Sequence, residues 1–309
     1  MPTKNQVHRN RPLENLSVAY RVGGLIADEL LPRLIVQHES DDYYVYTKDN
    51  LRLDTTLRAD GAESNETDWN LTTASYSVNF HALKHLVTDR VRGNADAAIK
   101  PDMDATETLT GKILLRKESD LATLLGADNW ANETSLTSTF AWSANTTLSN
   151  PISFCDSATT VILQNAGVKA NVMVLDHRTW KAAKEHISIV DRLKYTSAQS
   201  VGPDLLARLV GIDRILMAEA NYNAGGEGLT DSSQFLYTDC AWIGYINPGP
   251  GLKKLTAIQQ IVAAGDGAGT SVTKWREEKR KGDFVEVETN YTLKVVASDC
   301  AYVITNTIQ

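Results

Sequence analysis

The sequence predicts an α+β fold, and three stretches carry that prediction. Between residues 102 and 125, apolar side chains recur at steps of three, four and seven, which places them along one face of a long helix. Between 151 and 250, short apolar strands alternate with helical segments, as in a small α/β unit. After residue 251, almost every segment has the alternation of a strand.

The long helix has a clear beginning and a clear apolar face. Pro101 and Asp102 suit its first positions, where the hydrogen that proline lacks would be unpaired anyway. Asp104 and Glu107 add negative charge near the positive end of the helix dipole. We expect Gly126 to end the helix in a left-handed cap. The apolar face comprises Leu109, Ile113, Leu114, Leu121, Leu124 and Leu125.

The composition excludes several classes of partner. Of the 309 residues, 42% are hydrophobic and 22% are charged, as in a folded chain. A net charge of −7 excludes tight binding of nucleic acid through the overall field, so such a contact needs a local patch. No apolar run approaches the roughly 18 residues of a membrane helix, and none follows the basic N-terminus as in a secretory signal. We expect no membrane partner.

The N-terminal part begins with a polar segment. Residues 1–16 carry Lys4, Arg9 and Arg11 before the first acid, Glu14. Two interpretations stay open: an arm that orders on a partner, or a frayed terminus. A short helix is expected over 25–31, ending before Pro32, with an extended piece at 34–36.

Residues 40–90 are expected to form a long two-stranded ribbon that leaves the body of the protein. Residues 43–46 and 51–57 are expected to pair around a turn at 48–50, and 74–80 to form a further strand with Tyr76, Val78 and Phe80 on one face. An acidic stretch at 60–68 lies between them. A two-stranded ribbon with few aliphatic residues is marginal in water, so we expect it to lie on another surface. That is typical of an interaction protein.

The remaining elements follow in order. Residues 129–150, with Trp130 and Trp142, are expected to form an ordered loop, and a helix should run from Pro151 to a stop at Gly167. Helices are then expected at 176–186 and 203–210, and strands at 172–175, 212–218, 235–237, 241–246, 256–262, 271–277, 284–289, 291–297 and 302–304.

No catalytic or metal-binding pattern is complete. His81 and His85 are spaced like ligands on a helix, but the glutamate of a zinc protease and a third ligand are missing. The Gly-rich run at 263–270 lacks the Lys-Ser/Thr of a phosphate loop and is better read as a hairpin turn. Cys155, Cys240 and Cys300 lie far apart and are interpreted as small buried residues. We therefore expect no cofactor, no metal and no enzyme.

The densest charge cluster lies at residues 274–283 and mixes both signs. It is a poor patch for nucleic acid. Two interpretations stay open: a solvated hairpin, or an ion-pair surface between neighbouring subunits that uses Arg276, Lys279 and Arg280.

The order of arm, ribbon, long helix, α/β unit and final strands resembles the major capsid proteins of tailed bacteriophages. Their coat fold is shared with herpesviruses and encapsulins. The resemblance runs nearly end to end, and it rests on the order and spacing of short motifs. These are Ala19-Tyr20, residues 26–32 with Val36, 43–46, 58–62, 172–175 with Trp180, 187–192 with Tyr195, 211–212 and 220–222.

The resemblance implies a role for each part. Residues 1–38 would be an N-terminal arm that reaches a neighbour, and 39–92 an extended β-ribbon loop over the adjacent subunit. Residues 93–150 and 253–309 would form a peripheral domain around the spine helix, and 151–252 an axial domain. Contacts between subunits are expected at Arg9, Arg11, Tyr44, Tyr46, Arg58, Arg276, Lys279 and Arg280.

The same resemblance implies a function and partners. Copies of the chain would assemble into the hexamers and pentamers of an icosahedral shell around the double-stranded DNA of a tailed phage. The expected partners are other copies, a portal, a possible decoration protein and weakly held DNA. Because the chain starts at the arm, a separate scaffolding protein is also expected. The chain would be made in the cytoplasm of a bacterial host and end in the virion capsid. Two alternatives stay open: an encapsulin-like compartment shell with protein cargo, and an α/β enzyme using residues such as His186 and Asp191.

Overall fold

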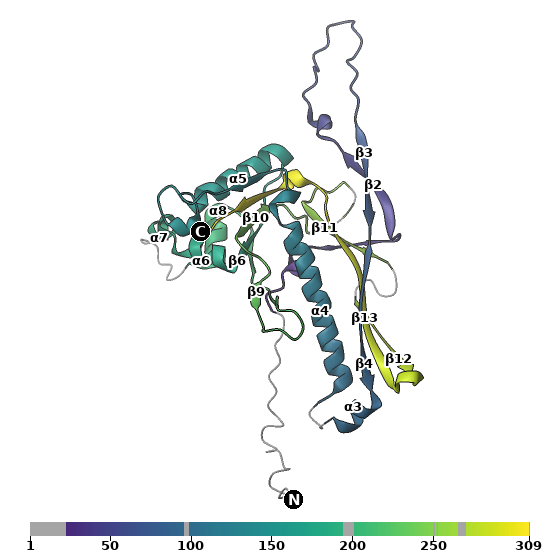
Figure 1. Ribbon diagram of the computed structural model, residues 1–309. Helices are drawn as coiled ribbons and strands as arrows, with labels where there is room; N and C mark the ends of the chain where they lie inside the picture. Colours follow the sequence, from purple (N-terminus) through teal and green to yellow (C-terminus); the bar gives the residue numbers. More distant parts are fainter. Residues whose placement is uncertain are drawn as a thin grey trace, which may run out of the picture.

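The computed structural model describes residues 23–95, 99–193, 201–249, 251, 253–264 and 270–308. The predicted α+β class is confirmed. One long helix meets a helix-covered sheet at one end and follows an elongated sheet along its side, and a two-stranded ribbon projects beyond both sheets (Figure 1). The predicted arm at residues 1–16, with Arg9 and Arg11, lies outside the described residues.

The spine helix α4 spans Pro101–Leu124, close to the predicted range, with proline in its first turn. Leu109, Ile113 and Leu121 are buried as predicted, whereas Leu114 and Leu124 are half-buried. The expected left-handed cap at Gly126 is wrong: this residue has a φ of −60°, because the chain continues from Leu125 directly into a short 3-10 turn, Ala127–Asn129. Two charged residues, Lys117 and Glu118, are also buried on the helix.

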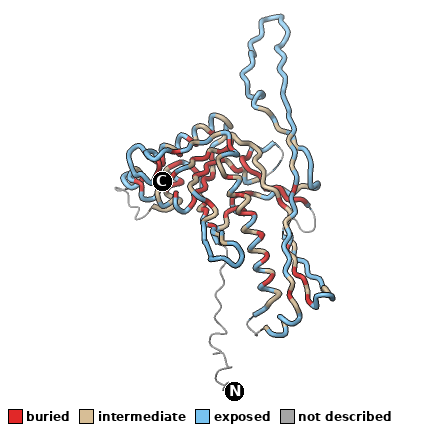
Figure 2. The backbone as a smooth tube through the Cα atoms, viewed as in Figure 1, coloured by how far each residue is buried: buried red, intermediate tan, exposed pale blue. Residues whose placement is uncertain are grey.

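The elongated sheet packs along α4. Its strand order is β1 (Arg33–Val36), β11 (Ile258–Ala263), β13 (Gly282–Val295) and β12 (Thr270–Glu277), and β4 (Asn79–Thr88) also pairs with β13. Val87, Val285 and Val287 meet the buried face of α4. Figure 2 shows this line of buried residues between helix and strands. A helical turn, α3 (Asp89–Asn94), follows β4.

Two predictions for this sheet are wrong. The strands expected at 284–289 and 291–297 are one strand, because Asn290 stays extended and pairs with Phe80. The Gly-rich run was expected to join a hairpin, yet β11 and β12 each pair with β13 and not with each other. Residues 265–269 within that run lie outside the described residues.

The second sheet has the order β5 (Glu133–Ser135), β14 (Ala301–Thr305), β10 (Cys240–Gly244), β6 (Val172–Asp176) and β7 (Arg214–Ala218). All five residues of β6 are buried, and their side chains alternate between two cores. Val172 and Val174 face the core shared with α4, whereas Met173 and Leu175 face the core under the helices. The sheet therefore includes strands from both sides of the expected boundaries at 151 and 252.

Four helices accompany this sheet: α5 (Pro151–Ala166), α6 (His177–Glu185), α7 (Ile187–Leu193) and α8 (Pro203–Val210). The predicted stop at Gly167 is confirmed, because this residue is left-handed, with a φ of 70°. Helix α7 was not predicted. A short pair, β8 (Asn221–Asn223) with β9 (Ser233–Phe235), lies beside the sheet. Trp142 in the predicted loop is fully buried.

The ribbon pairs differently from the prediction. Strand β2 (Ser40–Tyr46) pairs with β3 (Leu71–Ser77), and Tyr46 lies opposite Leu71. Residues 52–70 between them form no strand, so the expected pairing of 43–46 with 51–57 is wrong. Phe80 is exposed whereas Val78 is buried, because the chain changes partner from β2 to β13 between them.

Candidate assembly surfaces

The segment that leads in from the N-terminus is fixed to the spine helix by one buried carboxylate. Helix α2 (Ala27–Leu30) has no side-chain cap of its own. Glu118 of α4 accepts hydrogen bonds from the backbone N–H groups of Ile26 and Ala27, both at 3.0 Å. Its Oε1 also accepts the Tyr237 hydroxyl at 2.6 Å. Burial, and then the Glu118 charge, raise the pKa of Tyr237, so this phenol stays a donor.

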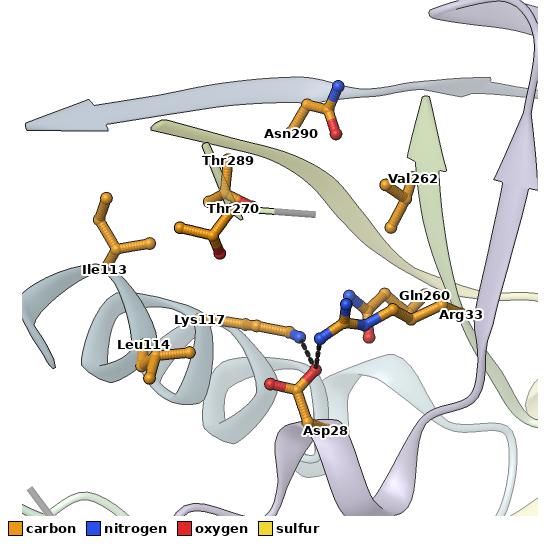
Figure 3. A pocket seen from close by; sticks show the side chains of 10 residues that line it. All are labelled: Asp28, Arg33, Ile113, Leu114, Lys117, Gln260, Val262, Thr270, Thr289 and Asn290. Atoms are coloured by element: carbon orange, nitrogen blue, oxygen red, sulfur yellow. Dashed lines mark hydrogen bonds and ion pairs between the residues drawn. The ribbon is translucent and has the colours of Figure 1, made fainter. Parts of the chain in front are cut away.

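An ion cluster lies beside this cap (Figure 3). Asp28 of α2 accepts hydrogen bonds from Lys117 at 2.5 Å and from Arg33 at 3.0 Å. Burial alone would raise the pKa of Asp28, but the bond and charge of Lys117 outweigh it and hold that pKa below its usual value. Burial lowers the pKa of Lys117, opposed by Asp28. The cluster joins α2, β1 and α4 at one point.

The space beside this cluster is small. A cavity of about 20 Å³ is lined by Lys117, Gln260 and Asn290 among others (Figure 3). Within the described part of the chain, Oε1 of Gln260 and Oδ1 of Asn290 have no hydrogen-bond partner. About 10–15 Å³ suffices for one water molecule, so the cavity has room for a bridging water and not for a substrate.

The base of the ribbon rests on its own chain. Lys48 forms an ion pair with Asp299 at 2.7 Å. The ammonium groups of Lys253 and Lys294 lie over the rings of Tyr46 and Tyr43, at 5.2 and 5.9 Å from the ring centroids. These contacts hold β2 where it leaves the body.

Beyond this base the ribbon exposes apolar side chains. Leu53 is fully exposed, and Leu57 and Trp69 keep 87% and 69% of their surface exposed. Figure 2 shows the whole projecting loop as exposed. Among the predicted contact residues, Tyr44 and Tyr46 are exposed on β2, and Arg58 donates to the carbonyl of Ala62 in the loop.

The ribbon also carries most of the chain's charge. Residues 39–70 contain nine Asp and Glu residues against three basic ones, Lys48, Arg52 and Arg58, which gives −6 of the total −7. The remainder of the chain is close to neutral. A single acidic, partly apolar projection is therefore available for contact with a basic surface.

The predicted charge cluster lies on the β12–β13 hairpin, where some of its charges are paired within the chain and others are exposed. Arg276 forms a two-pronged pair with Asp89 at 2.7 Å for both bonds, so its own chain occupies it. Arg92 pairs with Asp102 and Asp283, both at 2.7 Å. The hydrogen bond from Arg276 lowers the pKa of Asp89. Lys279 and Arg280, at the η5 turn (Glu278–Arg280), are exposed.

The histidines singled out in the sequence do not come together in the described part of the chain. His81 and His85 lie on strand β4, where four residues span about 13 Å, and not on a helix. The described residues hold no group of three side chains suited to a metal. His186 is fully buried, and its ring nitrogens lie 2.9 Å from Ser149 Oγ and 2.8 Å from Ser188 Oγ. No hydrogen bond to Asp191 is recorded among the described residues.

Two of the three cysteines are buried as predicted. Cys155 and Cys300 are buried, Cys240 is half-buried, and all three are free thiols. Burial raises the pKa of the Cys155 thiol to about 12. In the ranges that the structure describes, no helix is both long and apolar enough to cross a membrane.

Comparison with known proteins gives two related sequences. The major capsid protein of Burkholderia phage BcepMu is 26% identical over 223 residues, which cover 71% of each chain. The major capsid protein of Pseudomonas phage JBD67 is 29% identical over 242 residues, covering 74% of this chain and 76% of its own. No protein-family model matches the sequence.

Solved structures agree with the sequences. A phage-related protein from Bordetella bronchiseptica RB50 superposes with a TM-score of 0.70 at 22% identity, covering 93% of both chains. The capsid of cyanophage P-SCSP1u gives a TM-score of 0.64 at 11% identity, covering 94% of this chain and 90% of its own. This is the coat-protein fold of tailed phages. The predicted resemblance is confirmed, and the related sequences support a structural coat protein.

Relatives of the fold also include a compartment shell. The SrpI encapsulin complex from Synechococcus elongatus PCC 7942 matches with a TM-score of 0.53 at 12% identity, covering 97% of this chain and 96% of its own. That likeness concerns the fold alone. Both curated relatives, in contrast, are phage coat proteins.

Proposed function

We propose that copies of this chain form the hexamers and pentamers of an icosahedral shell that encloses the double-stranded DNA of a tailed phage. The observation that carries the proposal is the projecting loop at residues 52–70, which has no strand and exposes Leu53, Leu57 and Trp69. Each large apolar side chain gains about 1.5–3 kcal/mol on burial, so these side chains need a partner surface. Another copy of the chain supplies one at every position of a shell.

The parts of the chain take the roles expected from the sequence. Residues 1–38 form the arm, and 39–92 form the ribbon that lies over a neighbour. Residues 93–150 and 253–309 form the peripheral domain, except that their strands β5 and β14 join the sheet of the axial domain. Residues 151–252 form the rest of the axial domain around the symmetry axes. The Glu118 cap fixes the root of the arm to the spine helix, so the arm leaves the body at a defined point.

The distribution of charge indicates which two surfaces meet in the contact between subunits. The ribbon carries −6, whereas Lys279, Arg280 and Lys281 follow one another at the tip of the β12–β13 hairpin. We place the acidic ribbon of one subunit against this hairpin tip of a neighbour, with Tyr44, Tyr46 and Arg58 on the ribbon side. Arg276 acts indirectly, because its pair with Asp89 holds the hairpin in place. Arg9 and Arg11 belong to the arm contact.

Other partners follow from the same role. A portal would occupy one vertex, a separate scaffolding protein would guide assembly, and a decoration protein could bind outside. DNA would be held weakly, since the chain is acidic overall. The chain would be made in the cytoplasm of a bacterial host and end in the virion.

The test is size-exclusion chromatography and electron microscopy of the full chain expressed alone and with its neighbouring phage genes. Closed shells, or rings of five or six subunits, are the expected result. Nucleic acid in the lumen would support the phage shell, whereas a protein cargo would support the compartment alternative. A chain that stays monomeric at high concentration in both expressions would contradict the proposal.

A further inference from the structure

A cavity of about 320 Å³ lies where the end of α4 meets the second sheet. Its walls include Leu125, which directly follows α4, Asp176 of β6, Trp242 of β10 and the connecting residues Leu236 and Asp239. This volume is within the range of small-ligand sites, about 300–1,000 Å³. The proposed contacts between subunits do not use it.

Two of the lining side chains have unsatisfied polar atoms. Trp242 is fully buried, and its indole Nε1 has no hydrogen-bond partner among the described residues. Oδ1 of Asp239 is likewise buried without a partner there. Buried donors and acceptors are nearly always paired in folded proteins. The Asp239 oxygen needs a donor and the Trp242 N–H needs an acceptor, so the missing group supplies both, as a peptide segment with a basic side chain and backbone carbonyls does.

The cavity favours a cation. Asp176 and Asp239 both line it, and none of the lining residues in the described part of the chain is basic. Within the described ranges, Asp176 is bonded to the backbone N–H groups of Arg178, Thr179 and Cys240. Burial and then the charge of Asp176 raise the pKa of Asp239, which the Ile308 N–H and Arg178 partly oppose.

The chain has a basic segment rooted beside this cavity. Residues 1–22, which lie outside the described part, contain a single acid, Glu14, against Lys4, Arg9, Arg11 and Arg21. Gly24 directly follows the first described residue. It lies so close to Glu219 that a Cβ added to Gly24 would come within 2.9 Å of the carbonyl carbon of Glu219. The next residue, Ala220, accepts a 2.9 Å hydrogen bond from Leu236 of the cavity wall.

We propose that the N-terminal segment, residues 1–22, places one of its basic side chains in the cavity of its own chain, against Asp239. At most about 3.3–3.6 Å per residue, 22 residues reach roughly 70 Å, so the cavity is well within range. Tethering gives the segment a high effective concentration at this site. The contact lies within one subunit, so it goes beyond the proposed function and does not require a shell.

Docking would hold the segment back before assembly. A docked segment is unavailable to a neighbour, and it is released when a stronger contact forms elsewhere. The cavity would then act as a resting place for the arm of the free subunit.

Cys240 supplies the readout, because it lines the cavity and is half-buried, whereas Cys155 and Cys300 are buried. The rate at which iodoacetamide alkylates Cys240 is measured by mass spectrometry on dilute, full-length subunits. Replacing Lys4, Arg9, Arg11 and Arg21 together by Gln should raise the rate at least fivefold. Asp239→Asn should raise the rate more in the natural chain than in the arm variant, because the Asp239 charge acts on the Cys240 thiol in both but docking is lost only in the first. Asn tolerates the φ of 55° at this position.

The controls separate docking from unfolding. Asp213→Asn removes an exposed carboxylate that does not line the cavity, and should leave the rate unchanged. Cys155 and Cys300 should stay unreacted in every variant that folds. A second test uses the natural chain alone. Raising the salt concentration from about 50 mM to 1 M screens the charge contact between the segment and Asp239, and should speed alkylation of Cys240.

Two results would overturn the inference. One is an unchanged Cys240 rate in both the arm variant and high salt. The other is protection in the natural chain that disappears on dilution, which would place a neighbour's segment in the cavity. A chain that protects Cys240 but never assembles would contradict the proposed function alone.

Discussion

The carboxylate of Glu118 accepts the hydroxyl of Tyr237 at 2.6 Å, although 119 residues separate them along the chain. The same carboxylate caps the start of α2 through Ile26 and Ala27. One buried side chain therefore joins the root of the arm, the spine helix and the wall of the second sheet.

Glu118→Ala should destabilise the subunit strongly. It leaves two backbone N–H groups and a phenol unpaired, and each unsatisfied buried group costs about 1–3 kcal/mol. We expect the free energy of unfolding in urea to fall by about 3–5 kcal/mol. Glu63→Ala, on the exposed ribbon, is the matched control and should change it by less than about 0.5 kcal/mol. Equal effects from the two variants would contradict the role of the cap.

Asp28→Asn should destabilise the subunit at neutral pH and much less in acid. The lowered pKa of Asp28 means that its contribution is present above the unfolded value near 3.8 and is lost as pH falls through the folded value. Because Asp28 is partly exposed, we expect about 1–2 kcal/mol at pH 7. Urea titrations at pH 7, 4 and 3 should show the difference from the natural chain shrinking. A difference that grows toward pH 3 would contradict the pairing with Lys117.

Much of this fold follows from local pattern. Helices α4, α5 and α8 were predicted within a residue or two at either end, because apolar periodicity and a proline in the first turn act over a few residues. For α5, the glycine stop at Gly167 was also predicted. The buried strand β6 was predicted because its residues form a short run of apolar side chains, which is also a local signal.

Non-local relationships were not predicted. Nothing near residue 46 shows that its partner is Leu71 and not residues 51–57. Lys117 and Glu118 lie four residues after Ile113 and Leu114, in step with the apolar stripe, which was the available signal that these charges are buried. Their partners, Asp28 and Tyr237, lie about 90 and 119 residues away.

Arg276→Gln should loosen the end of the hairpin without unfolding the body. The lost pair with Asp89 lies at the surface, so the midpoint of thermal unfolding should stay within about 1 °C. Hydrogen exchange should quicken at α3, which Asp89 begins. Arg276→Lys keeps the charge but can make only one of the two hydrogen bonds to Asp89. Its exchange rate at α3 should lie between those of the natural chain and Arg276→Gln. No change in exchange at 89–94 would contradict this role.

Gly24→Ala should destabilise the subunit, whereas Gly23→Ala should not. Gly24 has a φ of 69°, and an added Cβ would meet the backbone of Glu219 at 2.9 Å. A left-handed residue other than glycine costs about 1–2 kcal/mol, before any clash. Gly23 has open space around it and serves as the control. Urea unfolding of both variants provides the comparison, and two similar midpoints would contradict the close packing at Gly24.

Leu53→Ser combined with Leu57→Ser should impair assembly and leave the subunit intact. Both side chains are exposed, so the unfolding free energy of the free subunit should change by less than about 0.5 kcal/mol. The yield of shells or rings by size exclusion should fall several-fold. Thr56→Ser, in the same exposed loop, is the control. Full assembly of the double variant would contradict burial of these leucines between subunits.

The contact between the acidic ribbon and a neighbour's basic hairpin tip is tested most directly by isotope-mixed cross-linking. Natural and ¹⁵N-labelled chains are dissociated, mixed, reassembled and treated with a carbodiimide, which joins carboxylates to lysines in contact. The account predicts peptides that join residues 54–68 to Lys279 or Lys281 and contain one labelled and one unlabelled partner. Joined peptides of a single isotope, or ribbon carboxylates linked only to their own chain, would contradict it.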